Sequence, residues 1–307
     1  MSFSAPDPGR TETTTARLVL AGVNRAHGGR FRLLNRLNGG FQSGTWLVRD
    51  SADGASLAVL KWSARSSGSG RLPRAAAAVE RAAAGGYRTP AWLAAGVTGD
   101  GFPYNVQEFV PGSPARRLTA GIAGKLVPLL ESQRGLDADP EHCWSRYVRE
   151  RLDGTTVGVR RGMAGPGARG HRFSAAIDAL LAVSGDVELP AHDLVHGDFR
   201  LANILFPTKH TPTAVDIEAL GSGTRAYDYA TLLTEDDVDP AGWDLIRDAG
   251  EQVAGPAVLA HCFALAALEL VDFVRLRVPE RLPVVIGPLT DRAAALTPPR
   301  ARHRTTP

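Results

Sequence analysis

Three oxygen-bearing side chains stand close together in the second half of the sequence. The run HGDFRLAN, residues 196–203, contains Asp198 and Asn203, and Asp216 follows the predicted short strand 213–215. The Asp198 carboxylate can accept a hydrogen bond from an attacking hydroxyl and align its oxygen. The Asn203 carbonyl and the Asp216 carboxylate are oxygen donors of the kind that Mg²⁺ prefers. Since phosphoryl transfer needs an orienting group and metal ligands, this set predicts that chemistry.

The order of three motifs resembles the pattern of a known family. The chain reads HGD-x4-N at 196–203, D-x-E at 216–218 and G-x6-D-x-A at 221–230. This order resembles the aminoglycoside phosphotransferase and choline kinase families, which are relatives of protein kinases. Protein kinases carry Arg where Gly197 stands and Phe-Gly after the metal-binding Asp, so Gly197 and Glu218 favour small-molecule kinases. The resemblance covers about residues 15–290 and implies an α+β, bilobal, protein-kinase-like fold.

The resemblance also implies an ATP site, with GTP left open, in the N-terminal lobe. Lys61 ends the apolar strand 57–60, where the family places the lysine that holds the α- and β-phosphates. Glu80 is the only acidic residue of the predicted helix 71–84 and is the expected partner of Lys61. Glu108 and Val110 are expected to read adenine through their backbone groups.

A glycine-containing loop at 38–44 could bring backbone amides to the phosphates, since glycine has no Cβ. We expect Gly40 and Ser43 to lie at this nucleotide site. An ordinary hairpin connection is the alternative interpretation of this loop.

Three further residues near the catalytic run have expected roles. Arg200 stands where protein kinases carry a lysine that faces the γ-phosphate, so we expect it to stabilise charge during transfer. His196 is expected to support the loop by hydrogen bonds. Asp228 is either a helix N-cap or, as the family implies, a brace for the catalytic loop.

The acceptor is the least determined part of the prediction. Glu235, Asp236, Glu269 and Asp272 are expected substrate contacts, which would favour a cationic small-molecule acceptor with a hydroxyl group. A solvated charge run is the alternative. The first functional interpretation is an antibiotic kinase of the aminoglycoside or basic-peptide type. A metabolite kinase for a choline-like amino alcohol or a sugar derivative is the second, and a pseudokinase is the third.

Composition sets broader limits on function. The 307 residues are 44% hydrophobic and 22% charged, with a net charge of +3 and two cysteines. These values favour a soluble globular protein without a disulfide framework. Basic residues form no stripe interleaved with aromatics, so we expect no nucleic-acid partner. We expect no membrane span and no signal peptide, and therefore a cytoplasmic monomer or dimer.

The predicted elements suggest two lobes between two tails. A disordered tail at 1–14 is followed by an N-terminal nucleotide-binding lobe at 15–110, a C-terminal catalytic and acceptor-binding lobe at 111–295, and a tail at 296–307. Strands are predicted at 31–37, 45–49, 57–62, 92–97 and 104–109, with an Asp53-Gly54 turn between the second and third. Helices are predicted at 15–27, 71–84, 117–134, 141–152, 173–183, 241–252 and 257–277, and short strands and turns at 194–216.

Overall fold

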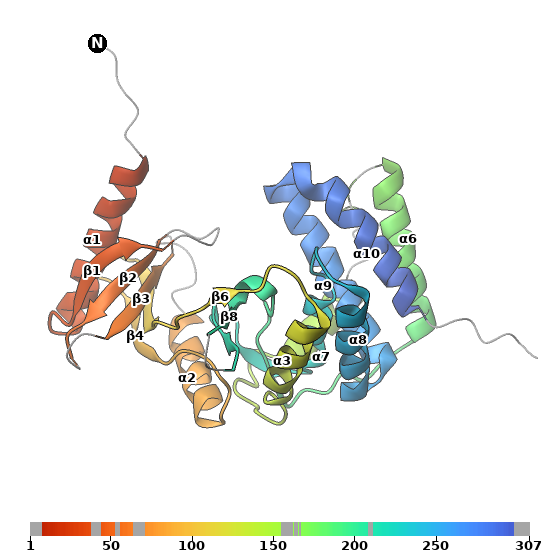
Figure 1. The fold of residues 1–307 in the computed structure, drawn as a ribbon, viewed down its shortest axis with the longest axis horizontal. Coiled ribbons are helices and arrows are strands. Elements are labelled where there is room, and N and C mark those ends of the chain that lie inside the picture. The colour runs from red at the N-terminus through yellow and green to blue at the C-terminus, as the bar shows by residue number, and fades with distance from the viewer. Residues whose placement is uncertain are drawn as a thin grey trace, which may run out of the picture. The chain divides into compact units, whose positions relative to one another are not determined.

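The structure, a computed structural model, describes residues 8–37, 44–52, 56–63, 71–154, 162, 165, 167–207 and 211–297. The chain forms two compact units, Met1–Pro111 and Gly112–Pro307 (Figure 1). The first unit is built on an antiparallel sheet, and the second is mainly helical. This architecture confirms the predicted α+β class.

Five strands make the sheet of the first unit, in the order β1-β2-β3-β5-β4. They are β1 (Phe31–Arg36), β2 (Thr45–Asp50), β3 (Leu57–Trp62), β4 (Trp92–Val97) and β5 (Pro103–Glu108). Every neighbouring pair is antiparallel. The five predicted strands are therefore present, each within about a residue of its expected bounds. The Asp53-Gly54 turn lies outside the described residues.

Helix α1 (Pro8–Ala26) covers one face of this sheet (Figure 1). Its buried Val19 and Val23 share a core cluster with Leu60 and Trp62 of β3. Side chains alternate along a strand, so Lys61 lies on the opposite face from α1. The helix begins at Pro8, earlier than the expected start at residue 15, so part of the expected tail at 1–14 is helical.

Helix α2 (Arg71–Ala84) has the predicted bounds and packs against β4 and β5. Its buried residues Ala75, Ala78, Val79 and Ala82 recur at intervals of three or four, which gives one apolar stripe. Alanine also has the highest intrinsic helix propensity. Local preference and packing therefore specify the same helix.

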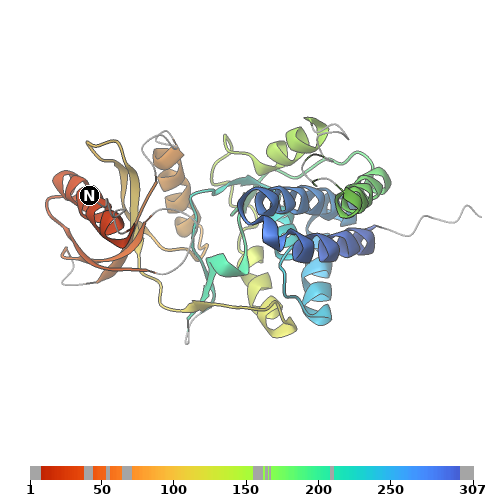
Figure 2. The same ribbon diagram turned by 90° about the horizontal axis from the view of Figure 1, so that it is seen from above.

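Helices dominate the second unit (Figure 2). They are α3 (Ala120–Glu131), α4 (Trp144–Gly154), α6 (Gly167–Ser184), α7 (Ala226–Leu232), α8 (Pro240–Ala254), α9 (Pro256–Arg277) and α10 (Leu282–Leu296), with the 3-10 turns η1 (Leu201–Asn203) and η2 (Pro279–Arg281). Helix α10 was not predicted. Its Pro288 lies inside the helix, where proline normally indicates a break.

Helix α9 is the central element of this unit. By length and composition alone it could cross a membrane. It packs against α4, α6, α7, α8 and α10, and most of its apolar side chains are buried. These contacts identify α9 as the core helix of the unit.

Short strands surround the catalytic run. They are β6 (Ser113–Pro114), β7 (Asp193–Val195), β8 (Ile204–Phe206), β9 (Thr213–Ala214) and β10 (Gly221–Gly223). β7 pairs with β10, and β8 pairs with both β6 and β9. The prediction of short strands and turns at 194–216 is confirmed, and these pairings fix both ends of the catalytic segment.

Candidate active site

Asp198 lies in the loop between β7 and η1, with 51% of its side chain exposed. Arg200 Nε donates to Asp198 Oδ1 at 3.0 Å. Asn203 Nδ2 donates to Asp198 Oδ2 and to the Asp198 backbone carbonyl, both at 2.9 Å. The carboxylate is therefore held in a defined orientation while remaining accessible. The structure thus brings together three residues that the sequence singled out.

Asp228 braces the catalytic loop from beneath. It lies in the first turn of α7 and is fully buried. Its carboxylate accepts hydrogen bonds from the His196 backbone N–H at 2.7 Å, the Gly197 N–H at 3.0 Å and Gln133 Nε2 at 2.7 Å. Burial raises the pKa of Asp228. Since Arg225 occupies the N-cap of α7, the N-cap interpretation is wrong and the bracing role is confirmed.

His196 links the Asp198 loop to the strand before Asp216. Its Nδ1 accepts from the Asp198 N–H at 3.2 Å, so Nδ1 is unprotonated in this arrangement. Nε2 therefore carries the hydrogen and donates it to the Val215 carbonyl at 2.9 Å. The Val215 backbone N–H in turn donates to the Asn203 backbone carbonyl at 2.8 Å. The loop-supporting role expected of His196 is confirmed.

Asn203 and Asp216 fit the demands of a Mg²⁺ site. The Asn203 amide N–H₂ is engaged by Asp198, which leaves the amide oxygen as the donor for a cation. Asp216 is the only described non-glycine residue with a positive φ, 64°. Such conformations concentrate at functional sites and need support from their surroundings. Two hard oxygen donors from separate segments, completed by phosphate oxygens, are typical of Mg²⁺ binding.

Trp144 packs against the catalytic loop at Gly197. A Cβ built on Gly197 would lie 2.1 Å from the Trp144 ring, and Gly197 has a φ of 84°. The indole stacks on Tyr227, with 5.0 Å between ring centroids, and its Nε1 donates to the Ala219 carbonyl at 3.0 Å. Trp144 and Tyr147 belong to one packed aromatic group, since these two rings lie edge to face at 5.4 Å.

Glu269 lies beside this aromatic group. It accepts hydrogen bonds from the hydroxyls of Tyr147 and Tyr227, the second at 3.1 Å. Burial and the bond to Glu269 raise the pKa of Tyr147 to about 12. Glu269 also borders a cavity of about 310 Å³. The cavity is lined by Arg151, Glu269, Asp272, Phe273, Leu276 and Arg277.

The other expected acceptor contacts have partners within the chain. Asp236 pairs with Arg281, and Asp272 pairs with Arg275 at 2.6 Å. Glu235 accepts a hydrogen bond from the Leu201 backbone N–H at 2.7 Å. Because burial raises the pKa of Glu235, this carboxylate also differs from a solvated surface charge. Whether any of them meets an acceptor stays a prediction.

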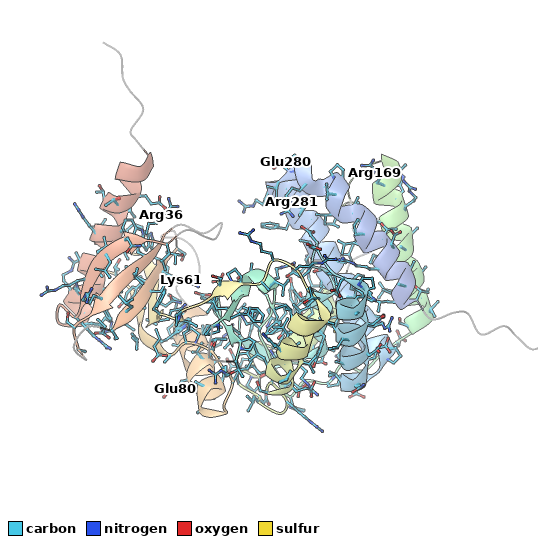
Figure 3. The ribbon with its side chains drawn as sticks, viewed as in Figure 1. Arg36, Lys61, Glu80, Arg169, Glu280 and Arg281 are labelled. Carbon is cyan, nitrogen blue, oxygen red and sulfur yellow. The ribbon has the colours of Figure 1, made fainter. Side chains whose placement is uncertain are left out.

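Two of the residues expected at the nucleotide site, Lys61 and Glu80, lie on different elements of the first unit. Lys61 lies on β3, opposite Thr45 of β2 and Asn105 of β5. Glu80 is exposed on α2, and Figure 3 shows it well apart from Lys61. The Glu80 side chain lies on the solvent side of its helix, and its expected partnership with Lys61 stays a prediction.

The remaining nucleotide predictions concern the loop and the hinge. Glu108 ends β5, and its side chain accepts from the Ala91 N–H at 3.1 Å. Val110 follows at the end of the first unit and is partly buried. Gly40 and Ser43 lie outside the described residues. These adenine and phosphate assignments stay predictions.

Sequence reasoning missed two contributors to the site. Gln133 is fully buried and donates to Asp228 although 95 positions separate them. Tyr227 joins Trp144 to Glu269. Neither has a local sequence signal, because each contact depends on how distant helices pack. The G-x6-D-x-A motif, which contains Tyr227, was the one available hint.

An antiparallel sheet unit followed by a helical unit with this catalytic loop defines a small-molecule kinase of the protein-kinase-like class. Residues 34–271 match the model of the APH phosphotransferase enzyme family, and the chain belongs to this family. No curated protein sequence matches the chain significantly.

Solved structures of phosphotransferases share the fold at low sequence identity. Aminoglycoside phosphotransferase APH(4)-Ia is 15% identical with a TM-score of 0.63, over 92% of this chain and 98% of that one. Macrolide 2′-phosphotransferase MphH from Brachybacterium faecium is 18% identical with a TM-score of 0.55, over 92% and 99%. A variant of APH(4)-Ia was solved as a ternary complex with AMP-PNP and hygromycin B. At these identities, the likeness establishes the fold alone.

Proposed function

We propose that the protein transfers the γ-phosphoryl group of ATP to a hydroxyl of a small cationic molecule. The observation that carries this proposal is the Asp198 carboxylate, which is accessible and oriented by Arg200 and Asn203. A base placed in this way can accept the acceptor's hydroxyl proton. The oxygen then bonds to the γ-phosphorus, the bond from phosphorus to the bridging oxygen breaks, and ADP leaves.

Arg200 is proposed to stabilise the charge that develops during this transfer. Its hydrogen bond to Asp198 places the guanidinium beside the catalytic carboxylate, where the reacting groups would meet. Arg200→Ala should lower kcat far more than it raises the acceptor KM, because the interaction strengthens in the transition state. An unchanged kcat would remove Arg200 from the mechanism.

The nucleotide and metal assignments complete the proposal. Asn203 and Asp216 would hold Mg²⁺, which when bound neutralises phosphate charge. Lys61 would hold the α- and β-phosphates, with Gly40 and Ser43 on the phosphate loop and Glu108 and Val110 at the adenine. GTP is the alternative donor. The complex of the related APH(4)-Ia with AMP-PNP supports nucleotide binding in this fold.

For the acceptor, a cationic antibiotic of the aminoglycoside or basic-peptide type is proposed, with resistance as the consequence. One observation favours the alternative, a metabolite kinase for an amino alcohol or sugar derivative. Asp236, Asp272 and Glu269 each pair with an arginine within the chain, Glu269 with Arg151 at 4.0 Å. Glu269, beside the aromatic group, has the longest of these three ion-pair distances and is then the best-placed carboxylate for a single cationic group. Fewer available carboxylates suit an acceptor with fewer positive charges.

A product screen separates these acceptors. Purified protein, ATP and Mg²⁺ are incubated with a panel of cationic antibiotics and a panel of amino alcohols and sugars. Mass spectrometry then detects the addition of one phosphate. Modification of an antibiotic, together with protection of cells that express the protein, supports the first acceptor class. Modification of amino alcohols alone supports the second. A protein that phosphorylates no hydroxyl compound and does not turn over ATP would contradict the proposed function.

A further inference from the structure

Glu235 follows α7 and reaches back to the catalytic segment. Its Oε1 accepts a hydrogen bond from the backbone N–H of Leu201 at 2.7 Å, in a partly buried setting. Leu201 is the first residue of η1, the single turn that ends at Asn203. The first N–H groups of a helical turn have no partner within the turn, so the carboxylate satisfies one of them. Glu235 thereby fixes the turn between Asp198 and Asn203.

The residue before Glu235 contacts the same segment. Arg200 Nη1 approaches Thr234 Oγ1 at 3.4 Å, and Thr234 Oγ1 donates to the Thr231 carbonyl at 2.7 Å. Thr234 is buried, so its hydroxyl has a fixed place at the end of α7. Residues 234 and 235 therefore hold the neighbouring residues Arg200 and Leu201 through two separate side chains.

Helix α10 anchors this pair in turn. Arg292 Nη1 donates to the carbonyls of Leu233 and Glu235, at 3.2 Å and 2.5 Å. Its guanidinium lies over the Trp243 ring of α8, 5.5 Å from the centroid. The chain segment that carries Glu235 is thus tied to two helices of the core, which makes it a rigid support.

We propose that Glu235 is a positioning residue for phosphoryl transfer, and that it acts through the Leu201 N–H on the orientation of Asn203 and Arg200. Glu235 is then not the contact for a cationic acceptor that the sequence suggests. This inference rests on the proposed phosphotransferase function. Placement errors of about an ångström at reacting groups can cost roughly 100-fold in rate, so a hydrogen bond at this turn has kinetic consequences.

Two conservative variants separate the effect of the Glu235 side-chain length from the effect of its charge. Glu235→Gln keeps an oxygen at the same distance from the backbone but removes the charge. Glu235→Asp keeps the charge but shortens the side chain by one methylene, so it no longer reaches the Leu201 N–H. A positioning role requires reach, whereas a contact with a cation requires charge. Hydrolysis of Mg·ATP without an added acceptor gives kcat and the KM for the nucleotide, and thermal unfolding verifies the fold.

We expect Glu235→Asp to lower kcat about tenfold or more and Glu235→Gln to stay within about threefold of wild type. The matched controls Glu280→Gln and Glu280→Asp, at an exposed residue of η2 (Figure 3), should leave kcat unchanged. The reverse order, with Asp active and Gln defective, would overturn the proposal, as would two variants equal to wild type.

The acceptor identified by the product screen provides a second readout. A Glu235→Gln protein that keeps its kcat but loses affinity for a cationic acceptor would show an acceptor contact and overturn the positioning role. If Glu235→Asp does not fold, Glu235→Ala replaces it as the variant without reach: a defective Ala variant beside an active Gln variant supports positioning, and a tenfold loss of kcat or acceptor affinity in Glu235→Gln contradicts it. A wild-type protein without ATP turnover would instead refute the proposed function itself.

Discussion

The indole ring of Trp144 occupies the space beside the α-carbon of Gly197. A Cβ on Gly197 would lie 2.1 Å from ring carbon Cζ2, closer than any packing permits. The ring is also fixed from behind by Tyr227 and by its hydrogen bond to Ala219. Helix α4 and the loop that carries Asp198 therefore fit together only if residue 197 has no side chain.

Gly197→Ala should consequently damage the site. The added methyl must displace Trp144, and the backbone of residue 197 must keep a φ of 84°, which favours glycine. We expect a loss of about 2–4 kcal/mol in the free energy of unfolding and a fall in kcat of at least tenfold. Chemical denaturation and steady-state kinetics measure both. Gly287→Ala, where nothing lies within 4 Å of the added Cβ, is the matched control. Equal stability of Gly197→Ala and wild type would contradict the packing described here.

Asp216→Asn tests the metal assignment without disturbing the backbone. Asparagine tolerates positive φ better than most residues, so the fold should be retained at the φ of 64°. The loss of the carboxylate charge should raise the Mg²⁺ concentration needed for half-maximal activity by roughly tenfold or more. A Mg²⁺ titration of ATP turnover measures this shift. An unaltered Mg²⁺ requirement would exclude Asp216 as a ligand.

A pH-dependent contribution to stability is expected from Glu131. Burial alone would raise its pKa, but hydrogen bonds from Arg225 and Tyr229 outweigh burial and lower it. A carboxyl group with a lowered folded-state pKa stabilises the fold above its unfolded pKa, near pH 4, and loses that contribution as the pH falls.

Tyr229→Phe removes the 2.7 Å bond to Glu131 and keeps the ring. We expect a destabilisation of only about 1 kcal/mol at pH 7, because Glu131 is partly exposed. The destabilisation should shrink toward pH 3, because the Glu131 carboxylate becomes protonated. Urea unfolding at the two pH values gives this difference. A cost that is the same at both pH values would show that the hydroxyl contributes independently of the Glu131 charge.

The sequence supported the site best where its residues are neighbours along the chain. Asp198 and Asn203 belong to one run, so their spacing alone predicted that they act together, and they share two hydrogen bonds. The strands were predictable because alternating burial leaves a periodic pattern, as in β3. The extent of α1 was underestimated, since residues 8–14 are polar and contain no apolar stripe.

The contacts of the acidic residues could not be predicted in this way. Glu235 was expected to face an acceptor, but its hydrogen bond to Leu201 spans 34 positions and depends on how α7 packs. Glu80 is the one acid of its helix, and it is exposed because the apolar stripe of α2 lies on the buried side. Long-range packing, not local preference, determines such partners.

The most direct test of the account is phosphoryl transfer by wild type and by Asp198→Asn. The variant keeps the size of the side chain and the hydrogen-bond acceptor for Arg200 but cannot accept a proton. We predict that wild type transfers the γ-phosphate of ATP to a hydroxyl acceptor, and that Asp198→Asn loses about 100-fold or more in kcat while binding ATP unchanged. Transfer by Asp198→Asn at the wild-type rate would contradict the central role of Asp198.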